Sequence, residues 1–209
     1  MKLIYKGNFK GLDQLPTGTL PDNAVKFKEP KTMAGLNALS MVFSLPAISF
    51  ILTFISFSVL IYGGIRYNAD TLESTIGMVM AFVCIFPHEL IHAICFGKDA
   101  EVELYTSPRH MTIFVTSTKA ISKARFVILS LLPSIIFGAI PLMMWAFLPA
   151  PIEVLSFLFP FSVVSILFGI GDYLNVYNAL WQMPKHSYHQ MSGFNSYWFI
   201  PNNPDESPS

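Results

Sequence analysis

Charged side chains and cysteines are both scarce in this chain. Only 12% of its 209 residues are charged, whereas about 25% is typical of soluble domains. The 13 basic and 13 acidic residues leave no net charge, so composition gives no basis for an acidic partner, and we expect no nucleic-acid partner. The two cysteines, Cys84 and Cys95, do not imply a disulfide framework.

The chain contains long apolar segments with few charged residues. Hydrophobic residues make up 53% of the chain, and four runs exceed the ~20 apolar residues needed to cross a bilayer. These runs are residues 39–65, 74–97, 126–148 and 154–181. We therefore expect an all-α integral membrane protein with about four transmembrane helices. No signal peptide precedes the first run, so residues 39–65 should remain in the bilayer as the first transmembrane helix.

The basic residues indicate how the chain is oriented. Arg66 is the one basic residue between the first and second runs; the other twelve precede the first run, separate the second from the third, or follow the fourth. Cytoplasmic segments carry the excess of Lys and Arg. We therefore expect a multi-pass protein of the cell membrane in which the N-terminal segment 1–38 and the tail 182–209 are both cytoplasmic.

The second run contains the motif Pro87-His88-Glu89-Leu90-Ile91-His92. On a helix, residues four apart are rotated by only about 40° and separated by about 6 Å along the axis, so both imidazoles can reach one ion. Glu89 lies beside them and is placed to accept a proton from the attacking water. The alternative is a pair of satisfied core histidines, but ionisable side chains at membrane depth are costly without a function.

A catalytic zinc ion needs a third protein ligand, and Asp172 is the one charged residue within the long interior of the fourth run. If both runs cross inward, His92 lies 17 residues after Thr75 and Asp172 lies 17 residues after Leu155, so the two are at similar depth. The predicted metal ligands are therefore His88, His92 and Asp172. In the alternative, Asp172 only bonds a neighbouring helix.

Small and polar residues line one face of each of these two helices, which favours close packing between them. Asn175 lies on the Asp172 face. It could hydrogen-bond the substrate carbonyl or the ligand carboxylate, or it could form an ordinary bond between helices.

Two further ligand sets are less favourable. Cys84 and Cys95 are separated by about 16 Å along a helix, too far for both to bind one tetrahedral ion. His186 and His189 form a second histidine pair in the aromatic tail, where such residues more often sit at the lipid headgroups.

Residues 101–118 differ from the apolar runs around them. Alternating β-branched segments flank Ser107 and Pro108, which predicts a β-hairpin at the cytoplasmic face. The hairpin edge could bind an extended substrate by strand addition, or the segment could simply connect two helices.

A His-Glu-x-x-His helix, one intervening span and an aspartate on the next span together resemble the site-2 protease class of intramembrane zinc metalloproteases. The likeness is closest to the multi-pass "putative zincin peptidase" family of bacteria and covers residues 74–181. The resemblance implies a three-helix zincin-like core of spans two to four, with His88, His92 and Asp172 binding Zn²⁺ and Glu89 as the catalytic residue. Where site-2 proteases carry Asn-Pro-Asp-Gly, this chain has Gly171 before the aspartate and Tyr173 after it.

The leading hypothesis is a zinc-dependent intramembrane endopeptidase that hydrolyses membrane or membrane-proximal protein substrates within the lipid bilayer. A metal or solute transporter and a proteolytically inactive zinc-binding scaffold are the alternatives. The sequence does not indicate the substrate, the regulator or the oligomeric state.

Overall fold

The computed structural model describes residues 1–108 and 112–201, and the chain divides into two compact units. The helical unit consists of Thr32–His88 and Leu131–Leu174. The sheet unit consists of Met1–Lys31, Glu89–Ser130 and the chain from Asn175 onward. Three helices contribute residues to both units, namely α4 (Ile85–Cys95), α5 (Lys123–Ser134) and α8 (Ile170–Gln182).

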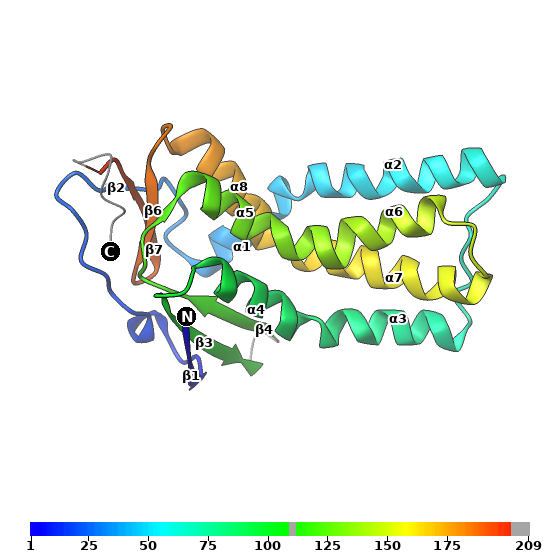
Figure 1. Cartoon of the computed structure of the whole chain (residues 1–209), viewed down its shortest axis with the longest axis horizontal. Coiled ribbons are helices and arrows are strands. Elements are labelled where there is room, and N and C mark those ends of the chain that lie inside the picture. Colours follow the sequence, from blue (N-terminus) through cyan, green and yellow to red (C-terminus); the bar gives the residue numbers. More distant parts are fainter. Residues whose placement is uncertain (109–111, 202–209) are drawn as a thin grey trace. The chain divides into compact units, whose positions relative to one another are not determined.

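The helical unit is built from long apolar helices. Threonine residues cap the N-termini of two of them, and a glycine ends a third. Its further elements are α1 (Met33–Phe43), α2 (Leu45–Tyr62), α3 (Leu72–Val83), the π-helix Ile135–Ala139, α6 (Ile140–Phe147) and α7 (Ile152–Phe168) (Figure 1). Thr32 and Thr71 cap α1 and α3 by accepting backbone N–H groups, which satisfies donors that lack partners within each helix. Gly63 ends α2 in the left-handed conformation that glycine adopts without strain.

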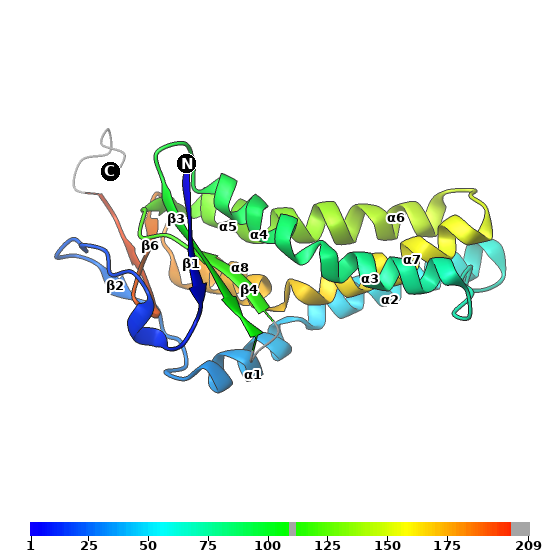
Figure 2. The same cartoon turned by 90° about the horizontal axis from the view of Figure 1, so that it is seen from below.

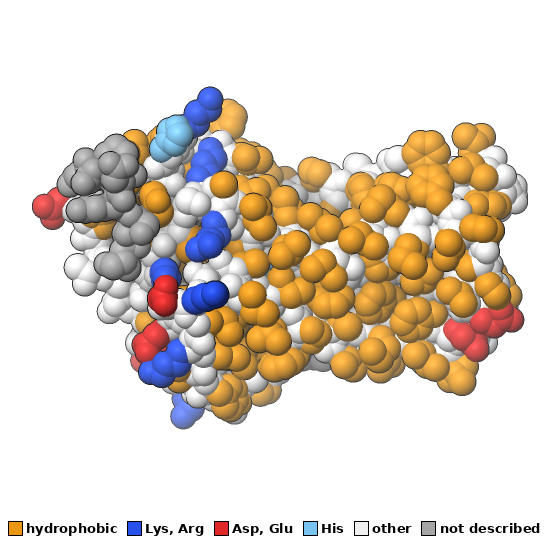
Figure 3. Space-filling view, in the orientation of Figure 1, with side chains coloured by type: hydrophobic (Ala, Val, Ile, Leu, Met, Phe, Trp, Pro, Cys, Tyr) orange, Lys and Arg blue, Asp and Glu red, His pale blue; other side chains and the backbone are white. Residues whose placement is uncertain are grey.

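Three helical stretches are long and apolar enough to span a membrane: Ala34–Tyr62, Leu72–Cys95 and Lys123–Phe147. The predicted fourth span is a broken helix, because α7 and α8 are bent by 50° at Gly169. On the face drawn in Figure 3, hydrophobic side chains cover the helical unit. Leu52 and Leu60 of α2 are among its exposed hydrophobic residues. An apolar outer surface is consistent with a membrane protein.

Close packing of α3 against α7 confirms the predicted pairing of the second and fourth runs. A Cβ atom added at Gly77 of α3 would lie 2.3 Å from the carbonyl oxygen of Phe157 on α7. Only glycine permits this approach, so a Gly77→Ala substitution would force the two helices apart. A second cluster around the fully buried Trp145 and Leu142 packs α6 against α7.

Prolines lie at irregularities in two of the long apolar helices. Pro87 has no N–H to donate to the Val83 carbonyl, and the helix is interrupted at that point, since α3 ends at Val83 and α4 begins at Ile85. Pro133 lies inside α5, and the π-helix follows directly after it.

Two β-sheets make up much of the sheet unit. One has the order β1-β3-β4 and consists of β1 (Lys2–Asn8), β3 (Glu101–Ser107) and β4 (Thr112–Thr116). The other has the order β2-β7-β6-β5 and consists of β2 (Val25–Lys26), β7 (Asn195–Phe199), β6 (Tyr188–Ser192) and β5 (Ile121–Ser122). Figure 2 shows β1, β3 and β4 side by side.

The all-α fold class is therefore wrong for the sheet unit. β1 pairs in parallel with β3, and Lys2 lies opposite Glu101, about a hundred residues away in the sequence. No local sequence pattern predicts a pairing between segments so far apart. The predicted hairpin over 101–118 corresponds to β3 and β4, which pair antiparallel, while residues 109–111 of its turn lie outside the described residues. Its cytoplasmic position stays a prediction.

Candidate metal centre

Helix α4 carries the His-Glu-x-x-His motif. Pro87 is its third residue, so the N–H that proline lacks is one of the four that have no partner within a helix in any case. His88 and His92 follow one turn apart, and both are buried, with 7% and 5% of their surface exposed. The local sequence therefore starts a new helix just before the motif and turns both imidazoles to the same side.

Within the helical unit, His88 contacts the aspartate that the sequence predicts as a ligand. His88 Nε2 lies 3.2 Å from Asp172 Oδ2, and both side chains are largely shielded from solvent. Asp172 lies in the first turn of α8, where the helix dipole favours a negative charge. The break at Gly169 makes this possible, because it converts the middle of the fourth run into a helix start.

Within the sheet unit, the backbone of α5 orients His92. His92 Nδ1 lies 2.8 Å from the carbonyl oxygen of Leu129, in a buried contact. A carbonyl oxygen only accepts, so Nδ1 carries the proton and donates it. Nε2 is therefore left with its lone pair, which is the form of histidine that binds a metal.

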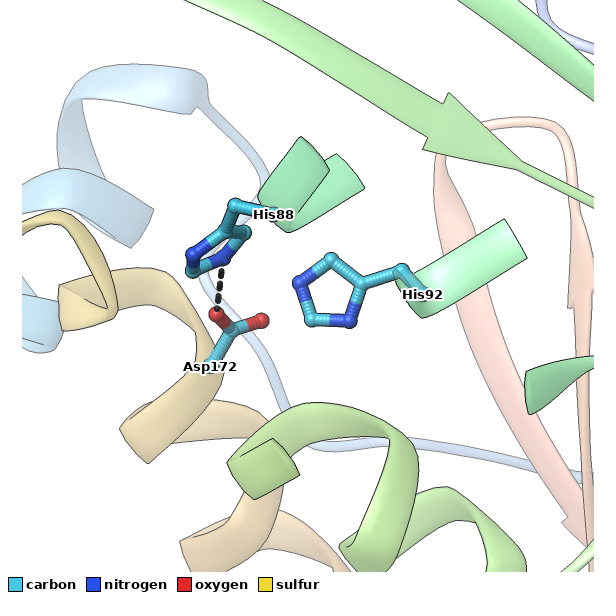
Figure 4. Close-up of side chains that lie close together, drawn as sticks. All are labelled: His88, His92 and Asp172. Carbon is cyan, nitrogen blue, oxygen red and sulfur yellow. Dashed lines mark hydrogen bonds and ion pairs between the residues drawn. The ribbon is translucent and has the colours of Figure 1, made fainter. Parts of the chain in front are cut away.

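The three predicted ligands form one group. His88, His92 and Asp172 each offer one ligand atom, and these atoms all lie within 4.8 Å of one another (Figure 4). Tetrahedral ligands about 2.0–2.1 Å from zinc lie about 3.3 Å from each other, close to the 3.2 Å between His88 and Asp172. Two imidazoles and one carboxylate, with a fourth position open, are the ligand set of a catalytic zinc site. The residues present therefore fit a zinc ion.

Glu89 is held by a strand. Its Oε2 accepts the backbone N–H of Val115 on β4 at 3.0 Å, and its side chain is half-buried. β4 is the edge strand of its sheet, so the hairpin is tied directly to the predicted catalytic residue. Sequence reasoning found the glutamate and the hairpin but gave no sign of this contact, since a backbone donor leaves no mark in the sequence.

The remaining candidates differ in outcome. Asn175 lies one turn after Asp172 on α8 and is half-buried, and its role stays a prediction. Cys84 and Cys95 are free cysteines outside the metal group. His189 is buried on β6 with its ring stacked on Phe126 and contributes to the core of the sheet unit, whereas His186 is exposed. Among the described residues, the metal group includes neither His186 nor His189.

A His-Glu-x-x-His helix with an additional carboxylate ligand defines the zincin class of zinc peptidases by its donor set. Residues 81–188, just over half of the chain, match the family described as "Putative zincin peptidase", and the protein belongs to this family. The matched segment includes both histidines, Glu89, Asp172 and Asn175. No curated protein and no solved structure matches the chain.

Proposed function

We propose that the protein is a zinc-dependent intramembrane endopeptidase that hydrolyses peptide bonds of membrane or membrane-proximal protein substrates. The observation that carries this proposal is the convergence of His88, His92 and Asp172, whose candidate ligand atoms lie within 4.8 Å of one another. The apolar helices support the location of the reaction, and membership of the zincin family supports its class.

The ligand set suits a site of low polarity. A bound zinc ion would supply a Lewis acid and lower the pKa of water toward about 7. Asp172 and Glu89 together carry two negative charges, which balance the two positive charges of the ion. A nearly neutral site avoids most of the free-energy cost of placing an unpaired charge in an apolar environment.

Glu89 would move the proton. Its carboxylate accepts a proton from the attacking water and later delivers it to the leaving amine, as a general base and then a general acid. The Val115 N–H donates to Oε2 and fixes the orientation of the Glu89 side chain. His88 and His92 are not needed for this step, so the roles of the three motif residues are separate.

A substrate must be extended at the site, because a helix hides its carbonyl groups in hydrogen bonds. Strand β4 offers an edge for an extended peptide, since β3 pairs with its other side. Val115 on this strand donates to Glu89, so a peptide added along β4 would run past the proton-transfer group. Strand addition would thereby expose the scissile carbonyl and bring it toward the catalytic carboxylate in one step.

The order of elements supports a likeness to site-2 proteases. The motif lies on the pair α3 and α4, one span intervenes, and the aspartate lies on the broken pair α7 and α8. We extend this likeness to the location, a multi-pass protein of the cell membrane with both termini in the cytoplasm, as the distribution of Lys and Arg predicts.

The test is a Glu89→Gln substitution, which keeps the shape of the side chain and removes the base. The variant should retain zinc and lose turnover by about 10²- to 10⁴-fold, the usual contribution of a positioned proton-transfer group. Zinc content is measured on purified protein, and turnover is measured as the shortening of membrane proteins in cells. Glu153→Gln is the matched control, because Glu153 is exposed in the first turn of α7.

The outcomes separate the three hypotheses. Identical membrane proteomes with zinc bound in both variants would contradict proteolysis and favour a scaffold. A change in zinc flux into proteoliposomes, without cleavage of any protein, would instead support a transporter. A wild-type protein that purifies without zinc, and does not bind it when supplied, would reject the metal centre itself.

A further inference from the structure

Pro133 is a fully buried proline inside α5. In a helix, each carbonyl accepts the N–H of the residue four positions later. For Leu129 that residue is Pro133, which has no N–H. The Leu129 carbonyl is therefore deprived of its regular helical donor.

This same carbonyl is the acceptor of His92 Nδ1 at 2.8 Å. Both groups are buried, where no bulk water can replace a missing partner, and a buried polar group without a partner is costly. An imidazole N–H and a carbonyl released by proline thus satisfy each other. In a regular helix the carbonyl would already accept one bond, and the imidazole would have to share it.

We propose that Pro133 is a positioning residue of the metal centre. By withholding an N–H from the Leu129 carbonyl, it supplies His92 with an acceptor that fixes the Nδ1–H tautomer and leaves Nε2 for the metal. This inference rests on the proposed function, in that it takes His92 as a zinc ligand. Pro133 itself touches neither metal nor substrate in this role and acts through the backbone of Leu129.

A purely structural role for Pro133 makes a different prediction. The π-helix Ile135–Ala139 follows it, and a Cβ atom added at Gly138 would lie 2.5 Å from a side-chain carbon of Ile166 on α7. If Pro133 served only this packing, its replacement would change the stability of the helices and leave the tautomer of His92 unchanged. The tautomer therefore distinguishes the two roles.

The experiment compares Pro133→Ala with Pro160→Ala in the purified full-length protein. Pro160 is also a buried proline inside a long apolar helix, α7, and the carbonyl that it deprives of a donor is that of Ser156, which belongs to α7 and not to α5. Zinc affinity is measured by competition with a chelator. We expect Pro133→Ala to weaken zinc binding by up to about 10-fold, because the Leu129 carbonyl remains but is shared with the restored helix N–H, and Pro160→Ala to leave it unchanged.

Two further readouts keep the inference testable if a variant folds poorly. In zinc-free wild-type protein, the ring nitrogen NMR signals of His92 should show the Nδ1–H tautomer, and Pro133→Ala should shift it toward a mixture. The thermal midpoint of zinc-free Pro133→Ala should be equal to or above that of wild type, because alanine restores a helix donor and has a higher helix propensity.

An Nε2–H tautomer in the wild-type protein would overturn the inference whatever the variants do. Equal loss of zinc in Pro133→Ala and Pro160→Ala would also overturn it, as would an unchanged affinity in Pro133→Ala. A wild-type protein without zinc affinity would reject the proposed function, while the tautomer measurement would still test the bond between His92 and Leu129.

Discussion

His92 and His189 are both buried histidines of the sheet unit, with 5% and 3% of their surface exposed, yet their surroundings are opposite. His92 donates a hydrogen bond from Nδ1 to the Leu129 carbonyl. The ring of His189 stacks on Phe126 at 3.7 Å with planes 5° apart, and lies against Phe27 on another side. In the part of the chain that the structure describes, neither ring nitrogen of His189 has a hydrogen-bond partner.

The comparison shows that burial alone does not make a histidine a ligand. Burial lowers the pKa of His189 to about 3, so this ring stays neutral and serves as a flat packing element of the core. His92 is equally enclosed, but its fixed N–H directs a lone pair toward His88 and Asp172. The polar contact of one nitrogen thus decides what the other can do.

The sequence spacing already separates the two pairs. His88 and His92 are four residues apart on a helix, which brings both rings to one side. His186 and His189 are three apart, and the first precedes β6 while the second lies within it, so no regular geometry brings them together. One histidine pair therefore belongs to the candidate metal group, whereas the other supplies only a single core residue, His189.

The largest expected effect comes from replacing the two histidines by phenylalanine. His92→Phe should weaken zinc binding by more than about 100-fold, because losing a ligand exceeds the roughly 10- to 100-fold cost of losing a ligand's partner. His189→Phe should leave zinc binding unchanged, since no metal group contains it among the described residues. Metal analysis and chelator competition on both variants measure the difference. Equal zinc affinities in the two variants would contradict the assignment of His92 as a metal ligand and His189 as a core residue.

A smaller effect is expected from the carboxylate. Asp172→Asn keeps the side chain's shape but removes its charge, so zinc affinity should fall severalfold to about tenfold. Asn175→Ala, one turn further along α8, should retain zinc affinity and lower turnover instead. The two variants are compared by the same chelator competition and by substrate cleavage. An unchanged zinc affinity in Asp172→Asn would place the third ligand elsewhere.

The sequence predicted the parts of the molecule that depend on local periodicity or local spacing. The apolar runs predicted the long helices, the spacing of the motif predicted the two histidines, and the single charge of the fourth run predicted Asp172. Each of these signals is short in range, because helix geometry and the cost of a buried charge act within a few residues.

The sequence did not reveal features that depend on distant backbone groups. The pairing of β1 with β3 joins Lys2 to Glu101, and two-residue strands such as β2 carry no periodic signal. Glu89 and His92 bond to backbone atoms of Val115 and Leu129, which any residue could supply. Pro133 is visible in the sequence, but its effect is on His92, 41 positions earlier in the chain. The sequence alone therefore does not predict its role.

The last prediction concerns His189 and acid stability, and it leaves zinc binding unaffected. Its pKa is about 3 in the folded protein and about 6.5 in an unfolded chain, so below pH 6.5 the unfolded state binds a proton that the folded state rejects. The free energy of unfolding should therefore fall by up to about 1.4 kcal/mol per pH unit as the pH drops from 6.5 toward 3. His189→Phe removes the titratable group, so neither its folded nor its unfolded state takes up a proton at this position.

The thermal midpoints of both proteins are measured in the same micelles between pH 7 and 4. The wild-type protein should lose stability faster than the variant as the pH falls. The difference cancels the contribution of other acidic groups, such as Glu29, whose pKa burial raises. If the thermal midpoints of the two proteins changed equally with pH, His189 would accept a proton in the folded state. Its surroundings would then not differ from those of His92 in the way described above.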